Sequence, residues 1–145
     1  MAGETAKAAE QGPDPSMQRA LFTRVISANA PAPLGHYEQA LLCGNTLYLS
    51  GLLGVDTTTE TPAEVSLLTQ TEFALHNLEA ILKPAGCDRS NVVRMTIFVD
   101  GVEGWRDVNR ACAEFFGEHK PARSIVPVGP LRLGARIEIE ATAAF

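Results

Sequence analysis

Short apolar runs bounded by Gly, Pro and polar residues predict six β-strands along the chain. In the longer runs, apolar and polar side chains alternate, which is typical of a strand with one buried face. The second and third runs are separated only by Gly44 and Asn45, two residues that tolerate positive φ, so we expect a tight β-hairpin there. The predicted strands are 21–26, 39–43, 46–50, 91–100, 122–128 and 135–144.

A longer segment after the third strand repeats apolar residues at spacings of three and four, which is the period of a helix with one buried face. Thr61, Pro62 and Glu64 mark its start as an N-cap, a proline in the first turn and an acidic residue. Pro84 and Gly86 end it. The predicted buried stripe comprises Leu68, Thr71, Leu75, Leu78 and Leu82, flanked by Leu67, Ala74 and Ile81.

A second helical pattern follows the fourth strand and ends at Gly117; its stripe comprises Trp105, Val108, Cys112, Phe115 and Phe116. The element order is therefore β-β-β-α-β-α-β-β, which predicts an α+β fold with a mixed sheet and two helices on one face. Two helices cannot cover both faces of the sheet. Because Leu47, Tyr48 and Leu49 make both sides of one strand apolar, we expect the open face to be buried against another subunit.

The composition is that of an ordinary globular protein, with 145 residues of which 46% are hydrophobic and 20% charged. The formal net charge is −5 and the Lys and Arg residues form no cluster, which argues against a nucleic-acid partner. Residues 1–16 have no large apolar side chain after Met1 and are expected to form a flexible tail. Residues 17–145 are expected to form a single domain.

Features of the ends and of the cysteines predict a cytoplasmic protein. No apolar run approaches the roughly 20 residues of a membrane-spanning helix, and the N-terminal segment carries Glu4 and Glu10 where a targeting sequence would be apolar or basic. Cys43, Cys87 and Cys112 are widely spaced and form no CxxC motif, so we expect three free thiols in a reducing compartment.

The chain carries no motif for a cofactor. It has no GxSxG elbow, Walker loop or GxGxxG sequence, and His36, His76 and His119 are scattered singly, so neither a cofactor nor a metal site is predicted. Any catalysis is then expected to use an ion pair or hydrogen bonds to hold a small substrate.

Arg123 is the most informative candidate, because it alternates with Ile125 and Pro127 in an otherwise apolar strand. A guanidinium in such a place is costly unless an anion pairs with it. Two interpretations remain open on spacing alone. One is a structural ion pair with Glu138 or Glu140, and the other is a bidentate clamp for the carboxylate of a substrate, which Arg suits better than Lys.

Six short stretches then resemble the RidA/YjgF family of reactive-intermediate deaminases, in the family's order, between about Val25 and Thr142. The strongest is the PARS sequence followed by RIEIEA, in which Arg123 and Glu138 are separated by the family's spacing. The stretches are 29–39 (NAPAPLGHYEQ), 48–51 (YLSG), 92–99 (VVRMTIFV), 108–109 (VN), 121–124 (PARS) and 136–141 (RIEIEA).

The resemblance implies a chorismate-mutase-like fold, a homotrimer with clefts between neighbouring subunits, and cofactor-free hydrolysis of 2-imino or enamine acids to 2-oxo acids and ammonia. By the same resemblance, Arg123 matches the arginine that binds the substrate carboxylate, and Glu138 matches the acid that orients or activates water. Tyr37, Ser50 and Asn109 match polar positions that line the cleft.

Local alternatives to these roles remain. Glu138 could belong to an exposed row of charges with Arg136 and Glu140. Ser50 could only satisfy the backbone at a strand end, and the Tyr37 hydroxyl could only face solvent.

Some positions depart from the family pattern. Ile125 stands where a cysteine is common, so only its backbone could contact a ligand, and Leu52 stands where many members have Gln. His36 replaces a common Pro, and the loop before Pro121 is short. These differences keep two alternatives open: a deaminase of a larger, aminomuconate-like enamine acid, and a non-catalytic trimer that binds carboxylate metabolites.

Overall fold

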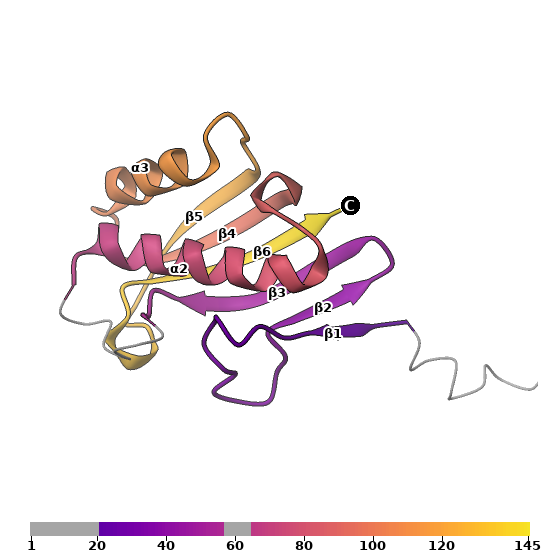
Figure 1. Cartoon of the computed structure of the whole chain (residues 1–145). Coiled ribbons are helices and arrows are strands. Elements are labelled where there is room, and N and C mark those ends of the chain that lie inside the picture. Colours follow the sequence, from indigo (N-terminus) through magenta and orange to yellow (C-terminus); the bar gives the residue numbers. More distant parts are fainter. Residues whose placement is uncertain (1–20, 57–64) are drawn as a thin grey trace, which may run out of the picture.

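The computed structural model describes residues 21–56 and 65–145, and its element order agrees with the predicted β-β-β-α-β-α-β-β arrangement (Figure 1). The strands are β1 (Thr23–Val25), β2 (Ala40–Cys43), β3 (Thr46–Leu53), β4 (Val92–Asp100), β5 (Ala122–Val128) and β6 (Ile137–Ala144). The helices are α2 (Leu67–Leu82) and α3 (Trp105–Phe116), with short 3-10 turns η1 (Lys83–Ala85), η2 (Arg89–Asn91) and η3 (Arg132–Gly134).

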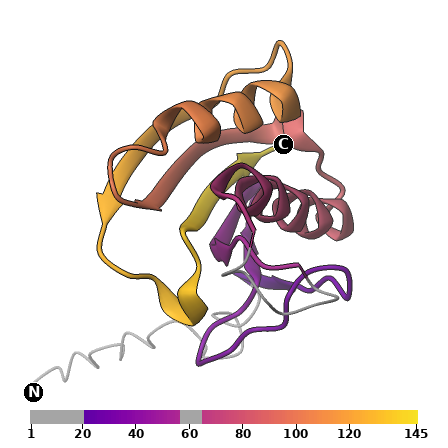
Figure 2. The same cartoon turned by 90° about the vertical axis from the view of Figure 1, so that its left-hand side faces the viewer.

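The six strands form one mixed sheet in the order β1-β2-β3-β6-β4-β5. Only β4 and β5 pair in parallel, and α3 forms the crossover between them, as a parallel pair requires. Both helices lie on the same face of the sheet (Figures 1 and 2). The predicted α+β architecture, with a mixed sheet and two helices on one face, is therefore confirmed.

The core lies between the helices and one face of the sheet. On β4, Met95, Ile97 and Val99 are buried, whereas the residues between them are at most half-buried, so the predicted alternation is confirmed from Met95 onward. The alternation also predicts that Val93 is buried, and this is wrong: Val93 is exposed and Val92 is buried, because the pairing with β6 shifts between Val92 and Arg94. On β6, Ile137 and Ile139 are buried on the same face.

The hairpin between β2 and β3 forms at Gly44-Asn45 as predicted, and Gly44 has a φ of 60°, which a residue with a side chain rarely adopts. The third strand continues past its predicted end to Leu53. The register of its pairing with β6 shifts between Leu49 and Leu52, so the residues between these two do not follow the regular pairing of the rest of the strand.

Helix α2 begins at Leu67, where the Ser66 side chain accepts a hydrogen bond from the backbone of Thr69. The predicted start at Thr61 lies outside the described residues, as does the predicted tail at 1–16. The predicted end is confirmed: α2 stops at Leu82, and Gly86 has a φ of 76°. Neither helix of the described residues is long and apolar enough to cross a membrane.

Two further predictions are wrong: the burial of Trp105 and the length of the first strand. Trp105 is 52% exposed, because Leu67 of α2 packs against the backbone of Gly104 and fills the space beneath the first turn of α3. The first strand is shorter than predicted: Leu21, Phe22 and Ile26 lie outside β1 and are exposed.

The open face of the sheet is less apolar than expected. Leu47 and Leu49 are buried on the helix side, whereas Tyr48 is exposed on the other side. A hollow of about 210 Å³ on this open face is lined by Tyr48, Arg94 and Glu140, among others. A partner that covers this face must therefore accommodate charged groups as well as an aromatic ring.

Candidate functional site

Arg123 lies on the edge strand β5, and its register with β4 determines which way it faces. Its pairing partner is Met95, which is buried on the helix side, so Arg123 also lies on the helix side, next to α3. The side chain is half-buried. Its Nη2 donates a hydrogen bond of 3.1 Å to Oδ1 of Asn109 on α3.

No carboxylate pairs with the Arg123 guanidinium among the described residues. On β6, Glu138 pairs with Phe98, which lies three residues after Met95 on β4, so Glu138 lies on the opposite face of the sheet from Arg123. The hypothesis of a structural pair within the chain is therefore wrong for Glu138. It is wrong for Glu140 too, which alternates with the buried Ile139 and shares the open face.

A pocket of about 450 Å³ opens between α3 and β5, and Arg123 forms part of its wall. Met95, Cys112 and Phe116 make its apolar side. Besides Arg123 and the Cys112 thiol, the charged or titratable groups that line it are His119 and Lys120 from the loop after α3, and no Asp or Glu lines it. The pocket thus joins an apolar floor to a positively charged rim.

The Cys112 thiol lies beside Arg123 in this pocket. Burial raises the pKa of Cys112, and the neighbouring guanidinium acts in the opposite direction. All three cysteines are free, as predicted. The sequence predicts Cys112 only as part of the buried stripe of a helix, because helical periodicity shows which residues face the sheet and does not show which of them border a cavity.

Glu138 is half-buried on the open face and accepts no hydrogen bond from the described residues. Its carboxylate lies directly against the backbone of Gly51 on β3, where a Cβ would collide with it. Burial raises the pKa of Glu138, and the like charge of Glu140 raises it further. The pKa of this carboxyl therefore lies closer to neutral pH than the pKa of an ordinary glutamate.

Ser50 lies on the same side of the site as Glu138, and Tyr37 belongs to the loop before β2. Ser50 precedes Gly51, and its Oγ donates a 2.6 Å hydrogen bond to the backbone oxygen of Glu38. The Tyr37 ring is 47% exposed, and its hydroxyl accepts a 3.1 Å hydrogen bond from the backbone of Leu34. Both hydroxyls are thus held in place by the backbone and retain further hydrogen-bonding capacity.

Ile125 follows Arg123 on the same face of β5 and pairs with Ile97. Its side chain is half-buried and packs against the core. The side chain therefore serves packing. Among the described residues, no group of three His, Cys, Asp or Glu side chains is placed to hold a metal ion.

The candidate residues form two separate groups within one chain. Arg123 and Asn109 lie at the sheet edge under α3, whereas Glu138 and Ser50 lie on the other side, next to Gly51. A strand directs successive side chains to opposite faces, so a small ligand held by Arg123 cannot also reach Glu138 of the same chain. The two groups can meet only between two copies.

The comparisons with known proteins agree on one family. The family described as Endoribonuclease L-PSP matches residues 27–145. The human protein named 2-iminobutanoate/2-iminopropanoate deaminase is 40% identical over 124 residues, which are 85% of this chain and 90% of the human protein. The chloroplastic Reactive Intermediate Deaminase A of Arabidopsis thaliana is 41% identical over 82% of this chain and 64% of its own length.

Solved structures match with the same coverage. Yeast Mmf1 superposes with a TM-score of 0.79 at 30% identity, covering 85% of this chain and 98% of that one. E. coli TdcF, solved with bound serine, gives a TM-score of 0.80 at 28% identity, with the same coverage. The likeness therefore extends over nearly all of the described residues.

Proposed function

Because the chain belongs to the Endoribonuclease L-PSP family, also called YjgF/RidA, we propose that it hydrolyses 2-imino and enamine acids to 2-oxo acids and ammonia. The relatives that are about 40% identical are named as imine deaminases, which confirms the prediction of an enzyme of this class. The observation that supports a small anionic substrate is the Arg123 guanidinium, half-buried beside a pocket with no acidic residue in its lining.

Arg123 binds the substrate carboxylate in this proposal. A guanidinium offers five N–H donors in a planar arrangement that matches a carboxylate. One of them is already directed at Asn109, and the Cys112 thiol lies beside the group. These contacts hold the plane of the guanidinium, and no carboxylate of the described residues competes for it. Such a charge-assisted, bidentate pair fixes the orientation of the substrate as well as its affinity.

Glu138 holds the attacking water. The carbon of a protonated imine is already electrophilic, so hydrolysis needs a positioned water and a group that accepts its proton. Water adds to this carbon, and the resulting carbinolamine loses ammonia to give the 2-oxo acid. The raised pKa of Glu138 suits this role, because a carboxylate that titrates closer to neutral pH is a better proton acceptor.

The two halves of the site come from different chains in this proposal. Arg123 and Asn109, at the β5 edge of one subunit, face Glu138, Ser50 and Tyr37 of its neighbour, in a homotrimer in which the β5 edge of each subunit meets the open sheet face of the next. The opposite orientations of Arg123 and Glu138 within one chain support this arrangement. A ring of three copies repeats the same contact three times and closes.

The activity is tested by mixing the protein with a PLP-dependent threonine dehydratase and following 2-oxobutanoate release under conditions where the free imine hydrolyses slowly. The wild type is expected to accelerate the release, and Arg123→Ala is expected to abolish the acceleration. If the wild type gives none, the proposal is wrong for small imines. Since the family description names a ribonuclease, a single-stranded RNA substrate is the matched comparison, and no cleavage is expected.

The two-chain site is tested by mixing subunits. Arg123→Ala and Glu138→Gln subunits are each expected to be inactive alone. Co-expressed, they restore an intact site wherever a wild-type Arg123 meets a wild-type Glu138 across an interface, which is about one site in four for random assembly. A site within one chain would give no recovery at all, and a monomer in sedimentation analysis would exclude the trimer.

A further inference from the structure

Within one chain, the pocket beside Arg123 is larger than a three- or four-carbon imino acid requires. Its volume of about 450 Å³ falls within the roughly 300–1,000 Å³ of sites that hold ligands of drug-like size. Cys112 and Ala113 contribute small side chains where α3 faces β5, and Pro121 follows the short loop at the pocket edge. If the carboxylate lies on Arg123, space remains for a longer side chain.

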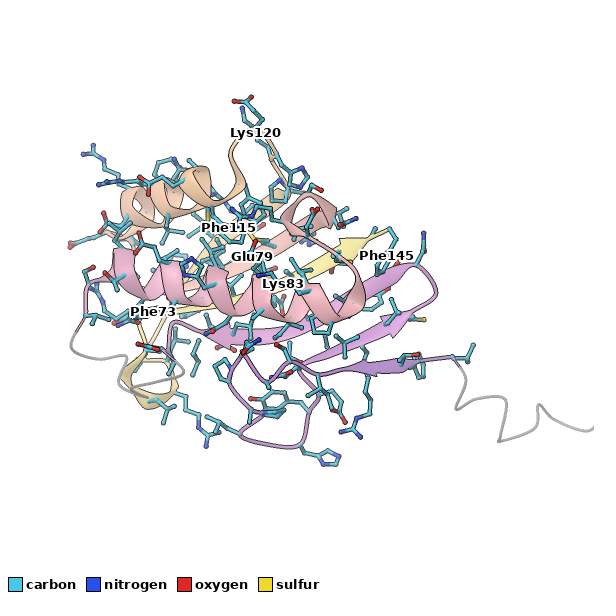
Figure 3. The ribbon with its side chains drawn as sticks, viewed as in Figure 1. Phe73, Glu79, Lys83, Phe115, Lys120 and Phe145 are labelled. Atoms are coloured by element: carbon cyan, nitrogen blue, oxygen red, sulfur yellow. The ribbon has the colours of Figure 1, made fainter. Side chains whose placement is uncertain are left out.

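The ionisable side chains around this pocket are basic, apart from the Cys112 thiol. Lys120 and Arg123 line it together with His119, whereas no Asp or Glu does, in a chain whose formal net charge is −5. Arg123 and Asn109 account for one anionic group. Lys120 is an exposed cation on the loop between α3 and β5, at the top of Figure 3, and the described residues give it no ion pair.

We propose that this pocket is a side-chain subsite and that the preferred substrate is a 2-imino dicarboxylate with a hydrocarbon spacer. The inference rests on the proposed deaminase function. Arg123 holds the carboxylate next to the imine, the spacer lies along Met95, Cys112 and Phe116, and Lys120 meets the distal carboxylate. Since water is delivered from the Glu138 side, the spacer extends away from it, under α3.

Three substrates separate length from charge: 2-iminopropanoate, 2-iminopentanoate and 2-iminoglutarate. The last two have the same number of carbons and differ in the distal carboxylate. Each is produced in situ from its amino acid by a flavin amino-acid oxidase, and the loss of imine is followed by trapping with semicarbazide. We expect kcat/KM to rise about tenfold from the first to the second substrate and a further fivefold to the third.

Two variants test the two features separately. Ala113→Phe fills the pocket from an exposed position of α3 and is expected to lower the preference for both longer substrates over 2-iminopropanoate about tenfold. Lys120→Met keeps the aliphatic stem and is expected to lower only the preference for 2-iminoglutarate over 2-iminopentanoate, about fivefold. High salt should weaken that second preference in the wild type as well.

Matched controls lie nearby. Glu114→Phe places the same aromatic ring on the next residue of α3, which does not line the pocket. Lys83→Met removes an exposed lysine at the end of α2, away from Lys120 (Figure 3). Neither control should change the preferences. Lys120 also follows the C-terminal end of α3, where any cation is favourable. If Lys120→Met lowers kcat/KM equally for both five-carbon substrates, Lys120 acts on the end of the helix, and its proposed role is overturned.

Binding of the corresponding 2-oxo acids, measured calorimetrically, tests the subsite separately from the deaminase function. Tighter binding of 2-oxoglutarate than of 2-oxopentanoate or pyruvate, lost in Lys120→Met, supports the subsite even if no imine is hydrolysed, in which case the deaminase proposal alone fails. Hydrolysis of all three imines at equal kcat/KM, with equal binding of the three 2-oxo acids, overturns the subsite and leaves the deaminase proposal standing.

Discussion

Arg89 and Arg123 are both half-buried, both contact α3, and have opposite surroundings. The Arg89 guanidinium donates to Oε1 of Glu79 through Nε at 3.1 Å and through Nη2 at 2.5 Å, and its Nη1 donates to the backbone oxygen of Phe115 at 2.5 Å. It also lies 4.1 Å from the centre of the Phe115 ring. Glu79 and Phe115 come together from α2 and α3 at this point (Figure 3).

The Arg123 guanidinium donates a hydrogen bond to Asn109, lies beside the Cys112 thiol, and has no carboxylate partner among the described residues. Glu138, which belongs to the family signature, is on the other face and also has no ion pair among the described residues. The difference separates charges that the chain satisfies itself from charges that it leaves for a ligand. Because unpaired charge is costly in a partly buried place, the second kind indicates a site.

The largest expected effects come from exchanging the two arginines for alanine. Arg123→Ala should lower kcat/KM at least 100-fold and leave the urea unfolding midpoint nearly unchanged, because the lost group has no internal ion pair. Arg89→Ala should keep most of the activity and lower the free energy of unfolding by about 1–3 kcal/mol, because it removes three hydrogen bonds and a cation–π contact. A similar destabilisation by both variants would remove the distinction between them.

Glu138→Gln extends the same distinction to an acid. We expect kcat to fall about 100-fold, since the amide cannot take up a proton. Burial raises the pKa of Glu138 in the folded state, so the folded chain holds this proton more tightly than the unfolded chain does. Its contribution to stability therefore falls as the pH rises from the ordinary glutamate pKa through the raised one. The amide should remove this loss and make the variant at least as stable as the wild type at neutral pH, as urea unfolding at two pH values would show.

A substitution at Asn109 can make the surroundings of Arg123 similar to those of Arg89. Asn109→Asp would give Arg123 an internal carboxylate, as Glu79 does for Arg89. We expect KM to rise about tenfold, because the ligand must then compete with the new ion pair, and stability to rise by about 0–1 kcal/mol. Asn109→Ala is the control: it loses the hydrogen bond without adding a charge, so its KM should rise less. A lower KM for Asn109→Asp would contradict the assignment of Arg123 as a carboxylate site.

The smallest expected effect is a shift in the pH dependence of kcat. Activity that needs ionised Glu138 should fall as the pH drops through the raised pKa of this carboxyl. Glu140→Gln removes the like charge that contributes to the shift, so the acid limb of the kcat profile should move to lower pH. Burial is the larger cause and remains, so the limb should stay above that of an ordinary glutamate. An unchanged limb would indicate that another group controls it.

Local patterns were sufficient for most elements of the fold. The Gly44-Asn45 hairpin, the end of α2 near Pro84 and the full extent of β5 lie where the sequence predicts them, because turn residues and alternation act over a few neighbours. The burial of Trp105 is predicted wrongly, because it depends on contacts between segments that are far apart in the chain. Its helical position is right, but the contact between Leu67 and Gly104, from distant parts of the chain, decides what lies beneath it.

What the sequence by itself determined is the order of the elements, the burial pattern of the sheet and, through the family motif, Arg123 and Glu138 as candidates. Only the tertiary structure decided that these two groups face opposite sides, that Asn109 orients the guanidinium, and that Cys112 and Lys120 border its pocket. The physical reason is that periodicity specifies which way a side chain points from its own strand or helix. What it meets there depends on register and packing between segments far apart in the chain.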